Sequence, residues 1–133
     1  MEKTRYGIIV KTNLGIEEAE EKIRASLAEE GFGILTEIDV AATLKKKLDI
    51  DRPFYKILGT CNPGLANQAL GAEEAIGLLL PCNVAVYESE AGGAVVAALD
   101  PGTMSELTDN QELDPVSSEA RTRIERALSA IEG

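Results

Sequence analysis

Two apolar runs around a glycine pair constrain the fold of this chain more than any other feature. Residues 84–90 and 94–100 are rich in valine and alanine, and Gly92-Gly93 lies between them. A glycine pair between two such runs predicts a β-hairpin, because glycine readily adopts the positive φ angles of tight turns. Both faces of this hairpin are apolar or small, so we expect both to be covered. Helices would cover one face, and a second copy of the chain is the expected cover of the other.

The rest of the sequence alternates between strand-like and helix-like patterns. Strands are predicted over residues 6–11, 32–39 and 54–60, where apolar residues alternate or run continuously. Apolar residues recur every three or four positions in the predicted helices, which cover residues 16–30, 40–48, 62–71 and 114–131. A further helical turn is expected over residues 73–80, and a loop or short helical turn over residues 101–110. This order predicts an α+β fold, a mainly antiparallel sheet with helices packed on one side, in a single domain of residues 1–133.

The charge of the chain argues against several classes of partner. The formal net charge is −10, whereas phosphate binding needs clustered lysine and arginine, so we expect no nucleic-acid partner and no anionic membrane surface. The one basic cluster, Lys45-Lys46-Lys47, lies between leucines and is typical of the solvated face of a short helix. Neither an N-terminal signal sequence nor an apolar stretch of about 20 residues is present, so the expected location is the cytoplasm.

The composition also excludes several chemistries. The chain has no histidine, which removes Ser-His-Asp and Cys-His catalysis and histidine-ligated metals. Two cysteines cannot build a closed zinc site, and the glycine-rich motifs of nucleotide-binding loops are absent. We therefore name no catalytic residue and no cofactor, and the sequence favours a protein that is not an enzyme.

Two short segments of the sequence resemble each other, Thr60-Cys61-Asn62-Pro63 and Pro81-Cys82-Asn83-Val84. The first should end a strand and begin a helix, with an asparagine cap and a proline in the first turn. The second should begin the hairpin. We expect both segments to lie side by side at one end of the sheet, with the second asparagine bonded to backbone across the gap. The candidate ligand-binding or redox residues are Cys61, Asn62, Pro63, Pro81, Cys82 and Asn83.

Four interpretations of these segments stay open at this point. The cysteines could be buried packing groups and the asparagines could hold turns, since free cysteine is among the most buried residue types. The two thiols could form a reversible disulfide, which needs Cα atoms within about 7 Å. Cys61, Cys82 and Met104 could bind a soft metal such as Cu(I), which prefers thiolate and thioether ligands. The turns could also line a pocket for a small ligand.

These residues resemble the pattern of the family named domain of unknown function 302. The similarity is densest between Tyr55 and Met104, and it rests on Cys61-Asn62-Pro63, on Pro81-Cys82-Asn83 and on Asp100-Pro101. It implies an α+β domain with a fold like one half of the TATA-binding protein, which is commonly a homodimer and has no established activity. We therefore predict a non-catalytic ligand-binding or protein-interaction module that forms homodimers. The alternative is a thiol-based redox or soft-metal protein that uses Cys61 and Cys82.

Overall fold

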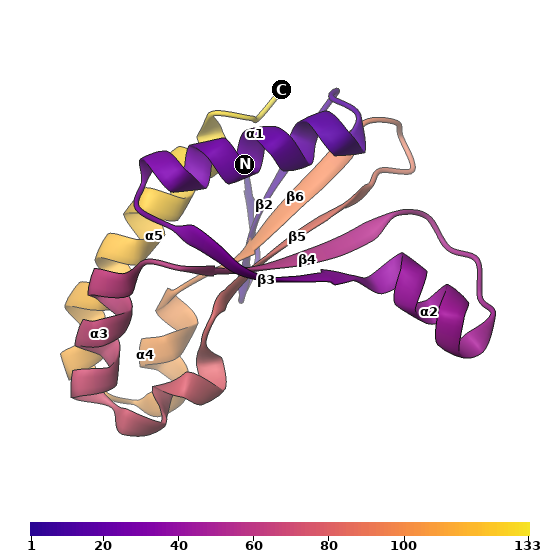
Figure 1. The fold of residues 1–133 in the computed structure, drawn as a ribbon. Helices are drawn as coiled ribbons and strands as arrows, with labels where there is room; N and C mark the ends of the chain where they lie inside the picture. The colour runs from indigo at the N-terminus through magenta and orange to yellow at the C-terminus, as the bar shows by residue number, and fades with distance from the viewer.

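The computed structural model describes residues 1–133 and has one six-stranded antiparallel sheet with helices on one side (Figure 1). The strand order is β1-β2-β6-β5-β4-β3. The strands are β1 (Glu2–Lys3), β2 (Gly7–Thr12), β3 (Gly33–Asp39), β4 (Tyr55–Cys61), β5 (Cys82–Glu88) and β6 (Ala94–Leu99). The α-helices are α1 (Ile16–Glu29), α2 (Val40–Leu48), α3 (Pro63–Ala72), α4 (Gly102–Thr108) and α5 (Asp114–Ser129). Two 3₁₀ helices, η1 (Glu74–Leu79) and η2 (Gln111–Leu113), complete the chain. The predicted α+β fold is thereby confirmed.

The predicted hairpin lies at the centre of the sheet. β5 and β6 pair antiparallel, with Val84 opposite Ala98 and Tyr87 opposite Val95. Gly92 and Gly93 have φ angles of 93° and 75° in the connecting loop, a region that favours glycine. The glycine pair thus sets the turn, and the flanking runs pair as predicted.

The main core lies between one face of the sheet and helices α1 and α5, which cross that face in Figure 1. Apolar residues at alternate strand positions supply the sheet side of this core, because side chains of a strand point to opposite faces in turn. The largest fully buried side chains in it are Ile8, Val10, Leu58, Val84, Val86 and Val96 from strands and Ile23, Leu27, Ile124 and Leu128 from helices. The helix-covered face is therefore packed as an ordinary protein interior.

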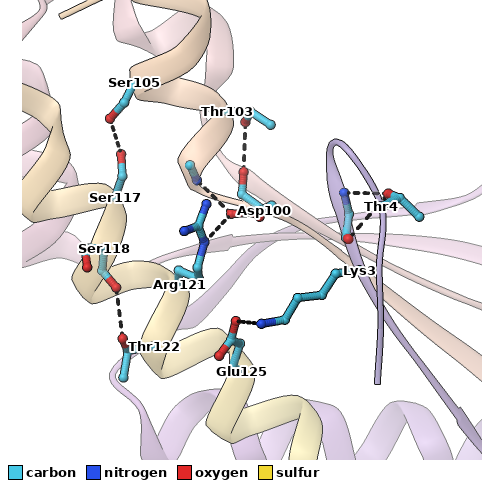
Figure 2. Close-up of polar contacts among 12 residues, drawn as sticks. Lys3, Thr4, Asp100, Thr103, Ser105, Ser117, Ser118, Arg121, Thr122 and Glu125 are labelled. Atoms are coloured by element: carbon cyan, nitrogen blue, oxygen red, sulfur yellow. Dashed lines mark hydrogen bonds and ion pairs between the residues drawn. The ribbon is translucent and has the colours of Figure 1, made fainter. Parts of the chain in front are cut away.

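Polar contacts attach α4 and α5 to the edge of this layer (Figure 2). Asp100 directly follows β6, and its carboxylate accepts hydrogen bonds of 2.8 Å from the backbone of Gly102 and from Arg121 Nε. Lys3 of β1 forms an ion pair of 2.8 Å with Glu125 of α5. The contacts of Asp100 fix α4 and α5 at the end of β6, and the start of β5, where the candidate site lies, is adjacent to that end.

Helix α2 differs from the other helices because it has no buried residue. In Figure 1 it projects from the end of β3 and β4, away from the core. The three lysines, Lys45 to Lys47, are exposed on this helix as expected, and Lys45 forms ion pairs with Asp49 and Asp51. None of the helices is both long and apolar enough to cross a membrane.

Three elements differ in detail from the sequence-based expectation. The segment after Ala72 is a 3₁₀ helix rather than a further α-helical turn. Residues 102–108 form a regular helix, α4, which buries Met104. The short strand β1 was not predicted, because its two residues, Glu2 and Lys3, are polar and pair only with the edge of β2.

Candidate functional site

The two Cys-Asn segments lie side by side at one end of the sheet. β4 and β5 are antiparallel neighbours, so that Thr60 pairs with Cys82 and Gly59 pairs with Asn83. The Thr60 hydroxyl also donates a hydrogen bond of 2.8 Å to the carbonyl oxygen of Cys82. The segments are thus fixed to each other by backbone pairing and by a buried side-chain bond.

A small cavity of about 20 Å³ lies where these segments meet α3, α4 and α5. The three candidate sulfur ligands line it, Cys61 from β4, Cys82 from β5 and Met104 from α4. Its other lining residues are Phe32, Thr60, Asn62, Leu65, Ala66, Ala69, Leu80, Val116 and Ala120. The structure therefore brings together three residues of which the first and the last, Cys61 and Met104, are more than 40 positions apart in the sequence.

The two thiols differ in their environment. Cys82 is 7% exposed, whereas Cys61 is half-buried, and both are free. Burial, and next the neighbouring Cys61, raise the pKa of the Cys82 thiol to about 11. With this pKa only about one Cys82 in ten thousand is a thiolate at pH 7. Cys82 is therefore a poor nucleophile at neutral pH.

The position of Cys61 departs from simple strand alternation. Alternation puts Cys61 on the same face as Tyr55 and Ile57, and that face is the one without helices. Cys61 is the last residue of β4, however, and it lines the cavity on the helix side. The chain turns there into α3, which ends the regular alternation.

Asn62 and Pro63 begin α3 as the sequence predicts. The Asn62 side-chain oxygen accepts a hydrogen bond of 3.2 Å from the backbone of Leu65, and Pro63 is the first residue of the helix. The Asn62 side-chain nitrogen also donates to the carbonyl oxygen of Glu30, at 3.4 Å, beyond the end of α1. Asn62 thus caps one helix and ties it to another.

Pro81 and Asn83 do not line the cavity. A Cβ atom at Gly59 would lie 2.9 Å from Cγ of Pro81, so the proline ring packs closely over this glycine. The peptide bond between Leu80 and Pro81 is cis. Asn83 is exposed on the face opposite Cys82, so the expected backbone bond from its side chain is wrong. Consecutive residues of a strand point to opposite faces, which separates Cys82 from Asn83.

The sheet face without helices is the second candidate region, and we call it the open face. It contains a depression of about 300 Å³ lined by Tyr6, Gly7, Ile9, Tyr55, Ile57, Asn83, Ala85, Tyr87, Ala97, Ala98 and Leu99. Figure 1 shows no helix across this face between α4 and α2. From the two apolar faces of the hairpin, the sequence predicted that this side of the sheet would be covered. It did not predict which residues of β2 and β4 would line the same surface.

Three tyrosine side chains line the open face. The rings of Tyr55 and Tyr87 are stacked with centroids 5.0 Å apart and an interplanar angle of 6°. Burial, followed by the neighbouring Tyr55, Glu2 and Tyr6, raises the pKa of Tyr87. Tyr6 is 70% exposed at the edge of the depression. The face therefore combines a partly buried aromatic pair with an exposed aromatic side chain.

A second depression, of about 290 Å³, continues the open face toward η1 and α4. It shares Tyr6, Asn83 and Leu99 with the first. Leu78 of η1 and Leu107 of α4 line it and are 88% and 70% exposed. Apolar residues thus extend from the centre of the sheet onto the adjacent helices.

Comparison with known proteins agrees with this architecture. A crystal structure of an uncharacterized conserved DUF302 protein from Bacillus stearothermophilus superposes with a TM-score of 0.89 at 25% sequence identity. The match covers 97% of this chain and 100% of that one. No protein with a curated description matches the sequence. The family profile described as "Domain of unknown function DUF302" matches residues 8–131, and the chain therefore belongs to this family.

Proposed function

We propose that this protein is a non-catalytic protein-interaction module that forms a two-fold homodimer through its open face. The observation that carries the proposal is the apolar surface of that face, which the chain's own helices leave uncovered. Soluble proteins rarely leave large contiguous apolar patches exposed, and such patches mark interaction sites.

A second copy of the chain fits the charge distribution of this face. The chain has 23 acidic residues, yet none of the 11 residues that line the central depression is charged. An acidic face would repel itself in a two-fold contact, whereas an uncharged apolar face is complementary to its own copy. Two-fold dimers are also the commonest soluble assembly.

The shape of the face favours a protein over a small molecule. A small-molecule site usually encloses most of its ligand within a concave pocket. The central depression here lies across four adjacent strands, β2, β6, β5 and β4, and opens to solvent. Aromatic side chains such as Tyr55, Tyr87 and Tyr6 are enriched at protein interfaces, where their rings supply contact area at low entropic cost.

Sedimentation equilibrium of the wild type and of Ile57→Glu tests the proposal. We expect the wild type to be a dimer at micromolar concentration. Ile57→Glu should weaken the dimer by at least about 100-fold, because a two-fold contact would bury two copies of the new charge. The matched control is Leu70→Glu on α3, an exposed leucine outside the open face, which should leave the dimer unchanged. A monomeric wild type, or an equal effect of both substitutions, would contradict the proposal.

A second candidate, a thiol-based redox pair, rests on the presence of Cys61 and Cys82 in one cavity. Disulfide formation would remove two protons and two electrons from the thiols and transfer the electrons to an oxidant such as glutathione disulfide. We place this function second because the raised pKa of Cys82 disfavours the reactive thiolate. Thiol counting after treatment with glutathione disulfide tests it, and two thiols retained per native chain would exclude it.

A further inference from the structure

The cavity between Cys61, Cys82 and Met104 has the size for one small occupant but offers little to water. At about 20 Å³ it exceeds the roughly 10–15 Å³ that one water molecule needs. Ten of its 12 lining residues are hydrophobic. A buried water is held by about three hydrogen bonds, so this cavity would have to supply several polar partners.

The polar side chains at the cavity already have protein partners. The Thr60 hydroxyl donates to the carbonyl oxygen of Cys82 at 2.8 Å. The Asn62 side chain accepts from Leu65 and donates to Glu30. No buried side-chain nitrogen or oxygen in the structure lacks a hydrogen-bond partner. The remaining chemically distinctive groups of the lining are the three sulfur-bearing side chains, Cys61, Cys82 and Met104.

The three sulfur-bearing side chains converge from separate elements that the fold holds in place. Cys82 and Met104 are 7% and 2% exposed, and Cys61 is half-buried. Cys82 is fixed by the β4–β5 pairing and by the bond from Thr60. Met104 lies on α4, which Asp100 and Arg121 attach to the end of β6 and to α5. Cys61 is therefore the most accessible of the three residues.

We propose that this cavity binds a single Cu(I) ion through the sulfur atoms of Cys61, Cys82 and Met104. Thiolate and thioether sulfurs are soft ligands that select Cu(I), whereas a closed Zn²⁺ site needs four ligands. On binding, each thiol releases its proton to solvent and the copper keeps its oxidation state. Two thiolates and one Cu(I) then carry a net charge of −1 in the cavity.

Burial opposes this charge, since it raises the pKa of the Cys82 thiol, so Cu(I) has to displace a proton that the metal-free protein holds at neutral pH. Two features act in the other direction. Cys61 directly precedes the N-cap of α3, a helix of ten residues whose N-terminal dipole stabilises negative charge. The net charge of −10 on the chain attracts cations to its surface. This site lies on the helix side of the sheet and does not depend on the open face.

Anaerobic titration with Cu(I), in competition with a chromophoric Cu(I) chelator, tests the proposal. We expect one Cu(I) per chain in the wild type. Loss of an outer-shell partner typically weakens metal binding 10- to 100-fold, so Cys61→Ala and Cys82→Ala, which remove a direct ligand, should each weaken it by more than about 100-fold. Met104→Leu conserves the side-chain volume and should weaken binding about tenfold. The control Leu70→Ala changes an exposed residue of α3 outside the cavity and should retain the wild-type affinity.

Two further measurements keep the test independent of folding and of the dimer. X-ray absorption of the wild type loaded with Cu(I) should show a shell of sulfur neighbours, and a shell of nitrogen or oxygen neighbours would overturn the proposal. Failure of the wild type to compete with the chelator, or full affinity in either cysteine variant, would also overturn it. The monomerising variant Ile57→Glu should still bind one Cu(I), which separates this site from the proposed dimer.

Discussion

Replacement of Asn62 by alanine measures how strongly the first Cys-Asn segment holds the fold. Asn62 caps α3 through the backbone of Leu65 at 3.2 Å and donates to the carbonyl oxygen of Glu30 at 3.4 Å. Loss of an asparagine cap costs about 1 kcal/mol of stability. The Glu30 carbonyl oxygen still accepts a hydrogen bond from Arg123 Nη1 at 3.3 Å, so losing the bond from Asn62 should add little to the cost in stability. We expect Asn62→Ala to lower the free energy of unfolding by about 1–1.5 kcal/mol.

The second asparagine provides the matched control. Asn83 is exposed on the open face, so Asn83→Ala should change the free energy of unfolding by no more than about 0.5 kcal/mol. Urea denaturation followed by circular dichroism measures both variants at one protein concentration, because association would shift the midpoint. With a slope of about 2 kcal/mol/M, Asn62→Ala should lower the midpoint by about 0.5 M.

A third variant isolates the cap from the tie to Glu30. Asn62→Asp keeps an acceptor for the backbone of Leu65 but cannot donate to Glu30, so it should retain most of the wild-type stability. Equal losses from Asn62→Ala and Asn83→Ala would refute the assignment of different roles to the two asparagines. Wild-type stability in Asn62→Ala would show that the cap contributes nothing.

Two other predictions follow from packing and from the Cys82 thiol. Gly59→Ala would bring a Cβ atom into a clash with Thr36 Oγ1 and to 2.9 Å from Cγ of Pro81, so calorimetry should show a loss of about 1–3 kcal/mol in the free energy of unfolding. A Cβ atom at Gly71 in α3 would have no atom within 4 Å, so Gly71→Ala should raise the free energy of unfolding by up to about 1 kcal/mol. Burial raises the pKa of Cys82 from 9.0 to about 11, so the unfolded state loses the thiol proton at a lower pH than the folded state. The free energy of unfolding should therefore be unaffected by this group below pH 9 and should fall as the pH rises from 9 to 11. The loss should reach about 2–3 kcal/mol in urea unfolding and be absent in Cys82→Ala, and identical pH profiles for the two proteins would contradict it.

The hairpin and the long helices could be predicted because local sequence specifies them. Gly92-Gly93 sets the turn between β5 and β6, and the apolar periodicity of α1 and α5 matches the face that each buries. The β1 strand could not be predicted in this way. Its residues Glu2 and Lys3 carry no apolar pattern, and only pairing with β2 makes them a strand.

Part of the candidate site could also be predicted from the chain. Antiparallel neighbours joined by a helix return to the same end of a sheet, which brings Cys61 and Cys82 together. Nothing in the local sequence placed Met104, because its position depends on α4 docking through Asp100 and Arg121. The opposite orientations of Cys82 and Asn83 follow from strand alternation. Because the two Cys-Asn segments look alike in sequence, we expected both asparagines at the same site, and this expectation was wrong for Asn83.

The two Cys-Asn segments therefore have different physical roles despite their similar sequences. In the first segment the strand ends at Cys61, so Cys61 and Asn62 do not follow the alternation of side chains along a strand. Cys61 lines the cavity, and Asn62 caps α3. In the second, the strand begins at Cys82, and alternation sends its side chain to the helices and that of Asn83 to the open face. The start of β5 thus contributes to both faces of one sheet. At this strand the cavity and the depression of the open face therefore lie on opposite sides of the sheet.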